Sequence, residues 1–207
     1  MQALIDHDLV VFRCAASAEQ EDFSIAVLRA DALLDELLTK TGADDYRAFL
    51  TGKTNFRKSI YPEYKAQRVQ LEKPPALSQV IEHLKSKHKF MTLPGLEADD
   101  VMGIMATGTT IKDGVIVSID KDMQTIPAKF INPDKMRRAI RINPGAANLL
   151  VFRQAITGDS TDNYRGIPGI GPVKADKILS DANQLNLWSA VEQAFNDNKL
   201  TTEYALT

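Results

Sequence analysis

The sequence predicts an α/β fold in which helices flank a central, mostly parallel sheet. Short apolar runs alternate with segments of helical period along most of the chain, and this alternation is typical of parallel α/β units. The apolar run at 114–119 is unbroken, as expected for a strand covered on both faces. With 44% hydrophobic and 25% charged residues among 207, the chain can bury one sizeable core.

Each element follows from its local pattern. We expect strands at 3–5, 47–51, 90–93, 114–119 and 128–132. We expect helices at 23–40, ended by Gly42, at 77–84 after a Pro-Pro pair, and at 97–106. The stretch 52–73 lacks a clear period and is rich in Lys, Arg and Tyr, so we expect a mobile crossing between strand and helix there.

The chain is expected to divide near its Asn-Pro-Gly-Ala turn at residue 145. Everything after Asn148 reads as helical. The predicted domains are therefore an α/β core at 1–145, which includes the 52–73 stretch, and a helical subdomain at 146–207.

Composition excludes several classes of protein. No apolar run approaches the roughly 18 residues that a membrane span needs, and no basic segment precedes the first apolar stretch as in a secretory signal. We therefore expect a cytoplasmic protein without a membrane partner. The single cysteine, Cys14, can form no internal disulfide and is interpreted as a small core residue.

The net charge of −2 conceals a segregation of charge by sign. Six basic residues lie between 51 and 74: Lys53, Arg57, Lys58, Lys65, Arg68 and Lys73. Five more lie between 129 and 141: Lys129, Lys135, Arg137, Arg138 and Arg141. Either run by itself is typical of an ordinary solvated face.

The acidic residues form four clusters, at Asp6/Asp8, Glu97/Asp99/Asp100, Asp120/Asp122 and Asp159/Asp162. The first and third follow predicted strands, and the carboxyl ends of parallel strands meet at one edge of a sheet. Glu97 and Asp100 are three residues apart on one helical face, and Asp159 and Asp162 repeat that spacing.

Each acidic cluster has an ordinary structural interpretation, as a strand-end turn, a complement to a helix N-terminus, or a helix cap. Gathered in one crevice, however, the carboxylates would repel one another unless cations neutralised them. Carboxylates with water suit Mg²⁺ or Mn²⁺. The three histidines lack the spacing of a zinc site.

A glycine-rich turn follows the last acidic cluster. GIPGIG at 166–171 has the spacing of a hairpin between helices, in which Gly169 and Gly171 permit the turn and a close backbone approach. Pro172 is placed to open the next helix, and Lys174 could add positive charge. Cations among the acids would attract one phosphate while this turn held another on the same polymer.

These motifs occur in an order that resembles the metal-dependent 5′-nucleases. That family comprises flap endonucleases, the 5′-nuclease domain of bacterial DNA polymerase I, and the small 5′ to 3′ exonucleases of bacteriophages, which look most similar. The matching segments are 4–6, 55–58, 64–68, 96–103, 118–122, 158–163 and the 166–171 turn. The resemblance implies a PIN-like 5′-nuclease fold with a basic arch at 52–73, and a helix-three-turn-helix element around 158–180 that grips duplex DNA.

The resemblance also assigns roles to individual residues. Metal ligands, directly or through water, would be Asp6, Glu97, Asp99, Asp100, Asp120, Asp122, Asp159 and Asp162. Lys65 and Arg68 would point from the arch to the scissile phosphate, and Arg57 and Lys58 would hold the DNA backbone. Tyr64 would stack on a terminal base, although local packing is an open alternative for Tyr64 and Tyr61.

One departure from the family pattern concerns the second strand. Family members generally carry an Asp at its end, where this chain has Leu50, Thr51 and Gly52. We hypothesise that Asp8 or a water molecule fills this gap. The Gly-Lys-Thr at 52–54 imitates the end of a nucleotide-binding phosphate loop, but Arg47 stands where that motif needs glycine.

The implied activity is hydrolysis of phosphodiester bonds near a 5′ end by two or more Mg²⁺ or Mn²⁺ ions, leaving 5′ phosphates. Double-stranded or 5′-flapped DNA would be the partner, with RNA/DNA hybrids as further substrates and replication proteins as possible associates. A monovalent cation at the 166–171 turn is also implied. The sequence leaves the balance between exonuclease and flap cleavage open.

Two other functions fit parts of the sequence. The segment 4–11 also fits the nucleophile motif of haloacid-dehalogenase-type phosphatases, with Asp6 attacking and Asp8 as acid/base. That function leaves the basic 52–73 stretch, the Glu97 cluster and the glycine turn without a role. A non-catalytic protein that binds branched DNA is the second alternative, because the second-strand acid is missing.

Overall fold

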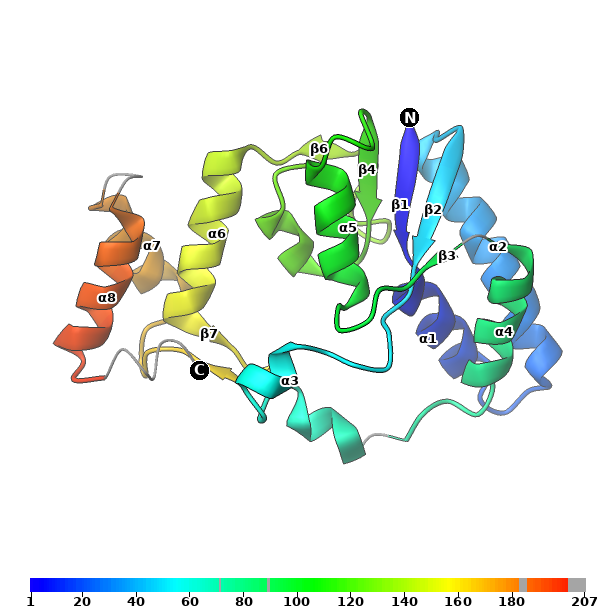
Figure 1. The fold of residues 1–207 in the computed structure, drawn as a ribbon, viewed down its shortest axis with the longest axis horizontal. Helices are drawn as coiled ribbons and strands as arrows, with labels where there is room; N and C mark the ends of the chain where they lie inside the picture. Colours follow the sequence, from blue (N-terminus) through cyan, green and yellow to red (C-terminus); the bar gives the residue numbers. More distant parts are fainter. Residues whose placement is uncertain (71, 89, 183–185, 201–207) are drawn as a thin grey trace. The chain divides into compact units, whose positions relative to one another are not determined.

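A computed structural model describes residues 1–70, 72–88, 90–182 and 186–200 of the chain (Figure 1). The chain forms two compact units. The first unit contains Met1–Asn55 and Glu72–Ile142, and the second contains Phe56–Leu71 and Asn143–Thr207. No helix in the described ranges is long and apolar enough to cross a membrane.

A six-stranded sheet forms the centre of the first unit. Its strands are β1 (Gln2–Asp6), β2 (Asp45–Phe49), β3 (Phe90–Met91), β4 (Gly114–Val117), β5 (Lys129–Ile131) and β6 (Ile140–Arg141). They lie in the order β3-β2-β1-β4-β5-β6, and only the β5–β6 pair is antiparallel. The central strand β1 pairs with both β2 and β4, so that Leu4 lies opposite Arg47 and Ile116. The predicted α/β class with a mostly parallel sheet is confirmed.

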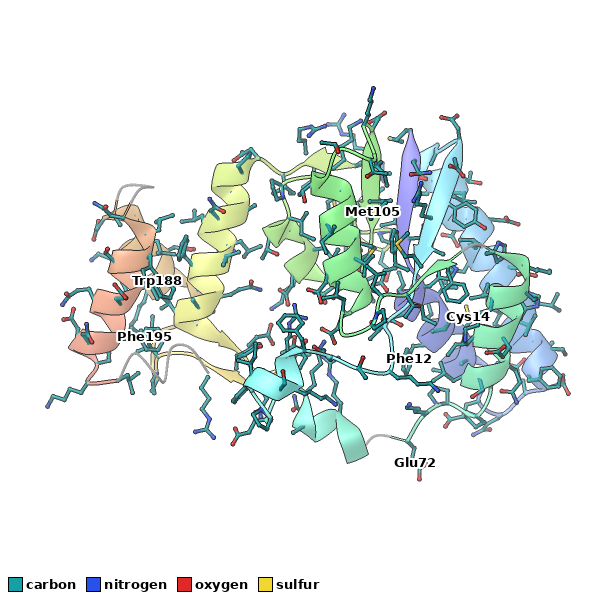
Figure 2. The ribbon with its side chains drawn as sticks, viewed as in Figure 1. Phe12, Cys14, Glu72, Met105, Trp188 and Phe195 are labelled. Carbon is teal, nitrogen blue, oxygen red and sulfur yellow. The ribbon has the colours of Figure 1, made fainter. Side chains whose placement is uncertain are left out.

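Helices cover both faces of this sheet. They are α1 (His7–Ser17), α2 (Phe23–Thr41), α4 (Leu77–Lys87) and α5 (Ala98–Thr107), with a short 3₁₀ helix, η2 (Lys121–Thr125), after β4. Ala3 and Ile5 of β1 face a core built with α1, α2 and α4, which includes the buried Cys14 (Figure 2). The alternate residue, Leu4, is also fully buried, and α5 packs against β1, β2 and β4. Because both faces are covered, residues 3–5 of β1 and residues 115–117 of β4 are all apolar and buried.

Helix α1 is absent from the sequence-based prediction because it follows β1 without a turn. The Asp6 carboxylate accepts a hydrogen bond from the Leu9 N–H, so the last residue of the strand is also the N-cap of the helix. Helix α2 ends at Gly42 as expected, where φ is +62° and the glycine closes the last turn.

The second unit is mainly helical. It contains α3 (Arg57–Ile60), the 3₁₀ helix η1 (Ala66–Gln70), α6 (Pro144–Thr157), β7 (Gly158–Asp159), β8 (Tyr164–Arg165), α7 (Pro172–Ser180) and α8 (Leu187–Asp197). Phe195, labelled in Figure 2, packs in a core shared by α6, α7 and α8. Asn143 caps α6 by accepting from the Ala146 N–H, so the predicted boundary turn is a helix start. Helix α7 begins at Pro172, as predicted.

Two features of the second unit differ from the expectations. The region after Asn148 contains the antiparallel pair β7–β8 between its helices. Residues 56–71, expected in the first domain as a mobile crossing, contain α3 and η1 and belong to the second unit. Aromatic contacts fix this segment: Tyr61 stacks on Tyr164 with ring centroids 5.4 Å apart, and its hydroxyl donates to the Asn163 carbonyl at 2.9 Å.

Gly158 supplies a stringent test of this arrangement. Its φ is +71°, and a Cβ there would lie 2.2 Å from the Gly166 nitrogen. We predict that Gly158→Ala lowers the free energy of unfolding by at least about 2 kcal/mol, since backbone strain and a clash with main-chain atoms combine. Gly171→Ala is the matched control, because Gly171 has φ −91° and a Cβ at that position would meet nothing within 4 Å. Urea denaturation checks both, and equal stabilities would contradict this account.

Candidate active site

The predicted acids of the first unit gather at the carboxyl edge of its sheet, the edge where the parallel strands end. Figure 1 shows β1, β2 and β4 pointing to this edge, from which α1 starts. Helix α5 also begins there, since the Ala98 N–H donates to the hydroxyl of Thr51, just after β2, at 3.0 Å. The edge therefore carries Asp6, Asp8, Glu97, Asp99, Asp100, Asp120 and Asp122.

Asp6 is the most buried of these acids, at 7% exposure. Its Oδ1 accepts from the Leu9 N–H at 3.3 Å, and its Oδ2 accepts from the Ser118 hydroxyl at 2.9 Å. Burial first, and the negative charge of Asp8 second, raise the pKa of Asp6 to about 6. The carboxylate is therefore fixed in place but costly to ionise.

Ser118 connects Asp6 to the segment after β4. Its Oγ accepts from the Asp120 N–H at 3.1 Å, and the Asp120 Oδ1 in turn accepts from the Asp122 N–H at 2.8 Å. Asn132 holds the same segment from β5 by donating to the Ile119 carbonyl at 3.0 Å. Ser118 and Asn132 are positioning residues that the sequence prediction missed. The one signal that the sequence offered for them was a polar residue directly after an apolar strand.

The segment after β2 has no acid of its own, but it binds the carboxylate of Asp8 from α1. The Thr51 N–H lies 3.4 and 3.3 Å from Oδ1 and Oδ2 of Asp8, which projects from the first turn of α1. Gly52 follows without a side chain. Asp8 therefore stands beside the position at which the sequence prediction noted a missing acid.

Glu97 and Asp100 form a capping box at the start of α5. The Glu97 N–H donates to Oδ2 of Asp100 at 3.0 Å, and the Glu97 side chain accepts from the Asp100 backbone. Asp99 lies in the same first turn. The structural interpretation of this cluster, complementing a helix N-terminus, is thus present in the molecule, and the helix dipole favours the negative charges there.

The donor chemistry of this edge fits Mg²⁺ or Mn²⁺, although no pre-formed cage is present. Among the described residues, no three His, Cys, Asp or Glu side chains converge closely enough to hold a metal ion. Mg²⁺ usually keeps several waters and binds one or two carboxylates together with substrate phosphates. The buried Asp6, with Asp8 close enough to raise its pKa, suits such a hydrated ion.

In the second unit, Asp162 is the centre of an ion-pair cluster. Its Oδ1 lies 3.0 Å from the Arg68 guanidinium and 3.7 Å from the Lys65 ammonium, and its Oδ2 accepts from the Tyr64 hydroxyl at 3.2 Å. Burial raises the pKa of Asp162 despite these partners. Asp159 accepts from the Thr161 N–H at 2.7 Å in the turn between β7 and β8. Lys65 and Arg68, expected to face a phosphate, are paired with a carboxylate of the same unit.

The other predicted DNA contacts in the 52–73 stretch are Tyr64, Arg57 and Lys58. Tyr64 is only 2% exposed and packs against Tyr164, so its ring has no free face on which a base could stack. The packing alternative therefore describes Tyr64. Arg57 lies over the rings of Phe56 and Tyr64, whereas Lys58 is exposed.

The glycine turn is formed with a single left-handed residue. Gly169 has φ +77°, whereas Gly171 has an ordinary φ of −91° and serves as the N-cap of α7. The Lys174 ammonium donates to the Gly169 carbonyl at 3.0 Å. A positive charge is thus already present at the turn where a monovalent cation was expected.

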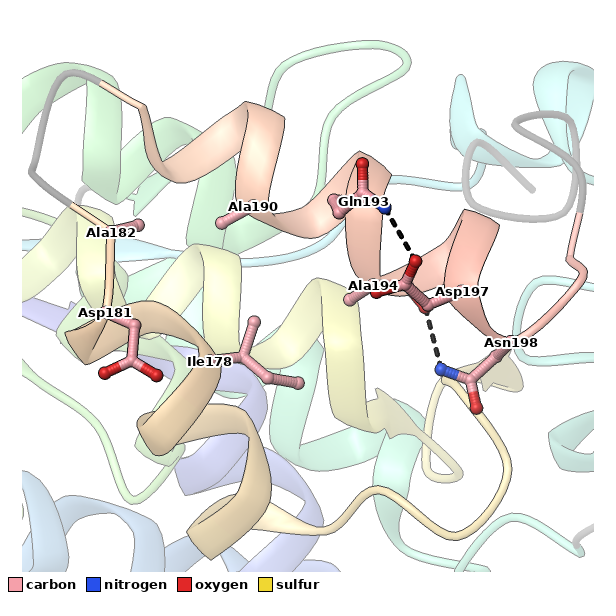
Figure 3. Close-up of a pocket in the computed structure, with 8 residues that line it drawn as sticks. All are labelled: Ile178, Asp181, Ala182, Ala190, Gln193, Ala194, Asp197 and Asn198. Carbon is pink, nitrogen blue, oxygen red and sulfur yellow. Dashed lines mark hydrogen bonds between the residues drawn. The ribbon is translucent and has the colours of Figure 1, made fainter.

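A separate pocket of about 370 Å³ lies between α7 and α8 (Figure 3). Its lining is Ile178, Asp181, Ala182, Ala190, Gln193, Ala194, Asp197 and Asn198. Gln193 donates to Asp197, one turn further along α8, at 2.6 Å. The pocket contains none of the predicted site residues.

Comparison with known proteins agrees with this geometry. Residues 3–141 match the family model of the 5′-3′ exonuclease N-terminal resolvase-like domain. The chain is 36% identical over 146 residues to the exodeoxyribonuclease of Enterobacteria phage T3, covering 68% of this chain and 48% of the phage protein. It is 34% identical over 141 residues to the exonuclease of Escherichia phage T7, covering 65% and 47%. The chain thus spans about half the length of these relatives.

Solved structures show the same fold. The phage T5 D15 protein, co-crystallised with metal ions, superposes with a TM-score of 0.75 at 18% identity, covering 99% of this chain and 86% of that one. The T5 5′-exonuclease with bound zinc gives a TM-score of 0.71 at 20% identity, covering 96% and 88%.

The fold and the carboxylate edge define a nuclease-type α/β protein of the 5′-nuclease class. More particularly, the chain belongs to the 5′-3′ exonuclease family, because the family model covers most of its length.

The buried Asp6 predicts an unusual pH dependence of stability without metal. The folded protein keeps Asp6 protonated up to its pKa of about 6, whereas the unfolded chain ionises it near 3.8. Stability should therefore fall as pH rises from about 4 to 6, by up to roughly 3 kcal/mol, and stay lower above that range. Asp6→Asn should remove this loss. Urea denaturation in EDTA at pH 4.5 and 7.5 checks it, and an unchanged pH profile in the variant would contradict it.

Proposed function

We propose that the chain is a divalent-metal-dependent 5′ to 3′ exodeoxyribonuclease and 5′ flap endonuclease. It would hydrolyse phosphodiester bonds near the 5′ end of duplex or branched DNA and leave 5′ phosphates. The observation that supports this most directly is the placement of seven carboxylate residues, among them the buried Asp6, along one sheet edge in a member of the 5′-3′ exonuclease family.

The residues proposed to hold metal in the first unit are Asp6, Asp8, Glu97, Asp99, Asp100, Asp120 and Asp122. In the second unit, Asp159 and Asp162 are proposed as metal ligands. Two bound Mg²⁺ or Mn²⁺ ions would supply a hydroxide from water and stabilise the leaving oxygen. The protein's own part is orientation: Ser118 fixes Asp6 and the Asp120 backbone in one hydrogen-bonded chain.

Lys65 and Arg68 would neutralise charge on the transferring phosphate. Both are now paired with Asp162, which is partly buried. A phosphate that approached this cluster would offer the two cations an anion in place of the Asp162 carboxylate. The pairing with Asp162 thus keeps two cations oriented until substrate arrives.

The second unit would grip the DNA backbone through the predicted helix-three-turn-helix element around 158–180, with Lys174 at its glycine turn, and through Arg57 and Lys58 of the same unit. Phosphate contacts carry no base code, so specificity would come from duplex shape and a free 5′ end. A solved T5 flap endonuclease structure of this fold contains DNA and metal ions. RNA/DNA hybrids are proposed as further substrates and replication proteins as partners. The proposed place of action is the cytoplasm of a bacterial host.

The direct test uses a 5′-labelled duplex with and without a 5′ flap, first with Mg²⁺ and then with EDTA. We expect labelled products with a 5′ phosphate in Mg²⁺ and none in EDTA, with DNA binding retained. Binding without cleavage in Mg²⁺ and Mn²⁺ would instead establish the non-catalytic alternative. A covalent phosphate on Asp6 would establish a phosphatase, which the burial of Asp6 disfavours.

Removing one carboxylate from either unit should separate catalysis from binding. We predict that Asp120→Asn and Asp159→Asn each lower the cleavage rate by at least roughly 100-fold, because a metal ion loses a charged ligand, while duplex affinity stays the same. Asp113→Asn and Asp181→Asn are matched controls at exposed carboxylates of the two units. Single-turnover cleavage and fluorescence anisotropy measure the two properties. Full activity in Asp120→Asn or Asp159→Asn would refute the proposal.

Asp8 would supply the carboxylate that the end of β2 lacks. We predict that Asp8→Asn weakens Mn²⁺ binding by roughly tenfold, as loss of a ligand usually does, and that Gly52→Asp added to Asp8→Asn recovers part of the loss. A Cβ at Gly52 would lie 3.2 Å from the Thr92 methyl and 3.4 Å from the Leu93 carbonyl oxygen. Isothermal titration of Mn²⁺ without DNA measures this, and unchanged binding in Asp8→Asn would remove Asp8 from the site.

A further inference from the structure

The loop 132–139, which joins β5 to β6, is firmly anchored at its first residues. Asn132 is 7% exposed, and its Oδ1 accepts from the Asp134 N–H at 3.0 Å and the Lys135 N–H at 3.2 Å. The amide of the same side chain donates to the Ile119 carbonyl. The loop is thus a built structure, and it begins beside the segment that carries Asp120.

Positive charge in this loop is not compensated. Its single acid, Asp134, is bound by both guanidinium nitrogens of Arg13, at 2.9 and 2.6 Å. Arg13 first, and Lys40 and Lys135 after it, lower the pKa of Asp134, so this carboxylate already serves several cations. Arg137 and Arg138 are exposed, and neither has an ion-pair partner in the described part of the chain.

The cations at the other end of the β5–β6 hairpin are accounted for differently. Lys129 pairs with Asp113 at 2.5 Å, and Arg141 lies opposite Lys129 in the sheet and also lowers the pKa of Asp113. The basic run identified in the sequence therefore divides into a compensated part on the strands and an excess in the loop. Lys135, Arg137 and Arg138 form that excess, here called the hairpin cations.

The loop that carries the hairpin cations lies next to the acidic edge of the sheet. Strand β5 adjoins β4, and the Ser118 N–H donates to the Ile131 carbonyl, so the loop starts next to the acidic edge. Acids at that edge repel a phosphate backbone wherever metal does not neutralise them. Fixed cations on the adjacent strand connection offset that repulsion and attract a polyanion of closely spaced charges.

We propose that the hairpin cations bind the phosphate backbone of duplex DNA, as a contact of the first unit that is independent of the second unit. This inference rests on the proposed function, because it takes DNA as the polyanion. The contact is to phosphates, so it strengthens binding and sets the position of the duplex without reading its bases. Lys135 binds as a point charge, and the two arginines add forked hydrogen bonding to phosphate oxygens.

The test is duplex binding as a function of salt. Arg137→Gln/Arg138→Gln should weaken binding of a fluorescent duplex in EDTA and lower the slope of log affinity against log salt by about 1.8, since each phosphate contact contributes about 0.9. Lys85→Gln/Lys112→Gln changes the net charge equally at exposed sites of the same unit and should leave the slope unchanged. Arg137→Lys/Arg138→Lys should restore most of the slope, which separates charge from folding.

The outcomes distinguish this inference from the proposed function. In Mg²⁺, the glutamine variant should raise KM while keeping kcat at saturating DNA. A wild-type protein that binds and cleaves DNA, with a glutamine variant of unchanged salt slope, overturns the hairpin contact alone. A wild-type protein that binds no duplex overturns both. Loss of binding to phosphatidylserine vesicles, with duplex binding intact, would assign the hairpin cations to a membrane surface and also overturn the inference.

Discussion

The burial of one carboxylate, Asp6, beside a second one, Asp8, is the constraint on which the carboxyl edge of the sheet depends. Burial and the neighbouring Asp8 raise the pKa of Asp6 to about 6. The fold keeps this acid where its ionisation is costly. Under the proposed function a cation would remove that cost, so a feature that weakens the metal-free protein would become a source of binding energy for metal and phosphate. Stability without ligand would therefore be exchanged for affinity at the site.

Neutral side chains hold the charged ones in place. Ser118 accepts a hydrogen bond from the Asp120 N–H and donates one to Asp6. The Thr51 N–H donates to Asp8, and the Thr51 hydroxyl accepts from the Ala98 N–H at the start of α5. Asn132 donates to the carbonyl of Ile119, the residue before Asp120. The contacts of Ser118 with Asp6, of Thr51 with Asp8 and α5, and of Asn132 with Ile119 join segments that are distant in sequence. Ser118, Thr51 and Asn132 each lie one or two residues past the end of a strand, so the sheet positions the acids through the segments that leave its carboxyl edge.

The sequence predicted those parts whose signals are local. The apolar run at 114–119 predicts strand β4. Gly42 predicts the C-terminal end of α2, and Pro172 predicts the start of α7. Helix α1 was missed because Asp6 is at once a strand residue and a cap, and β7 and β8 are too short to show a period. Among site residues, charge selected the acids, whereas Ser118 and Asn132 carry none. The sequence left both packing and base stacking open for Tyr64, because its partner Asp162 lies 98 residues away and no local pattern reports such a contact.

The second unit is built from two separate segments of the chain, which limits how the protein can be divided into fragments. The segment 56–71 belongs to it, yet that segment is inserted in the sequence of the first unit, so the backbone passes between the units three times. A fragment that begins at residue 143 would lack the side chains that cover Tyr164 and neutralise Asp162. The second unit is thus not a module that a single cut in the chain would separate, and any transplant of it must also carry segment 56–71.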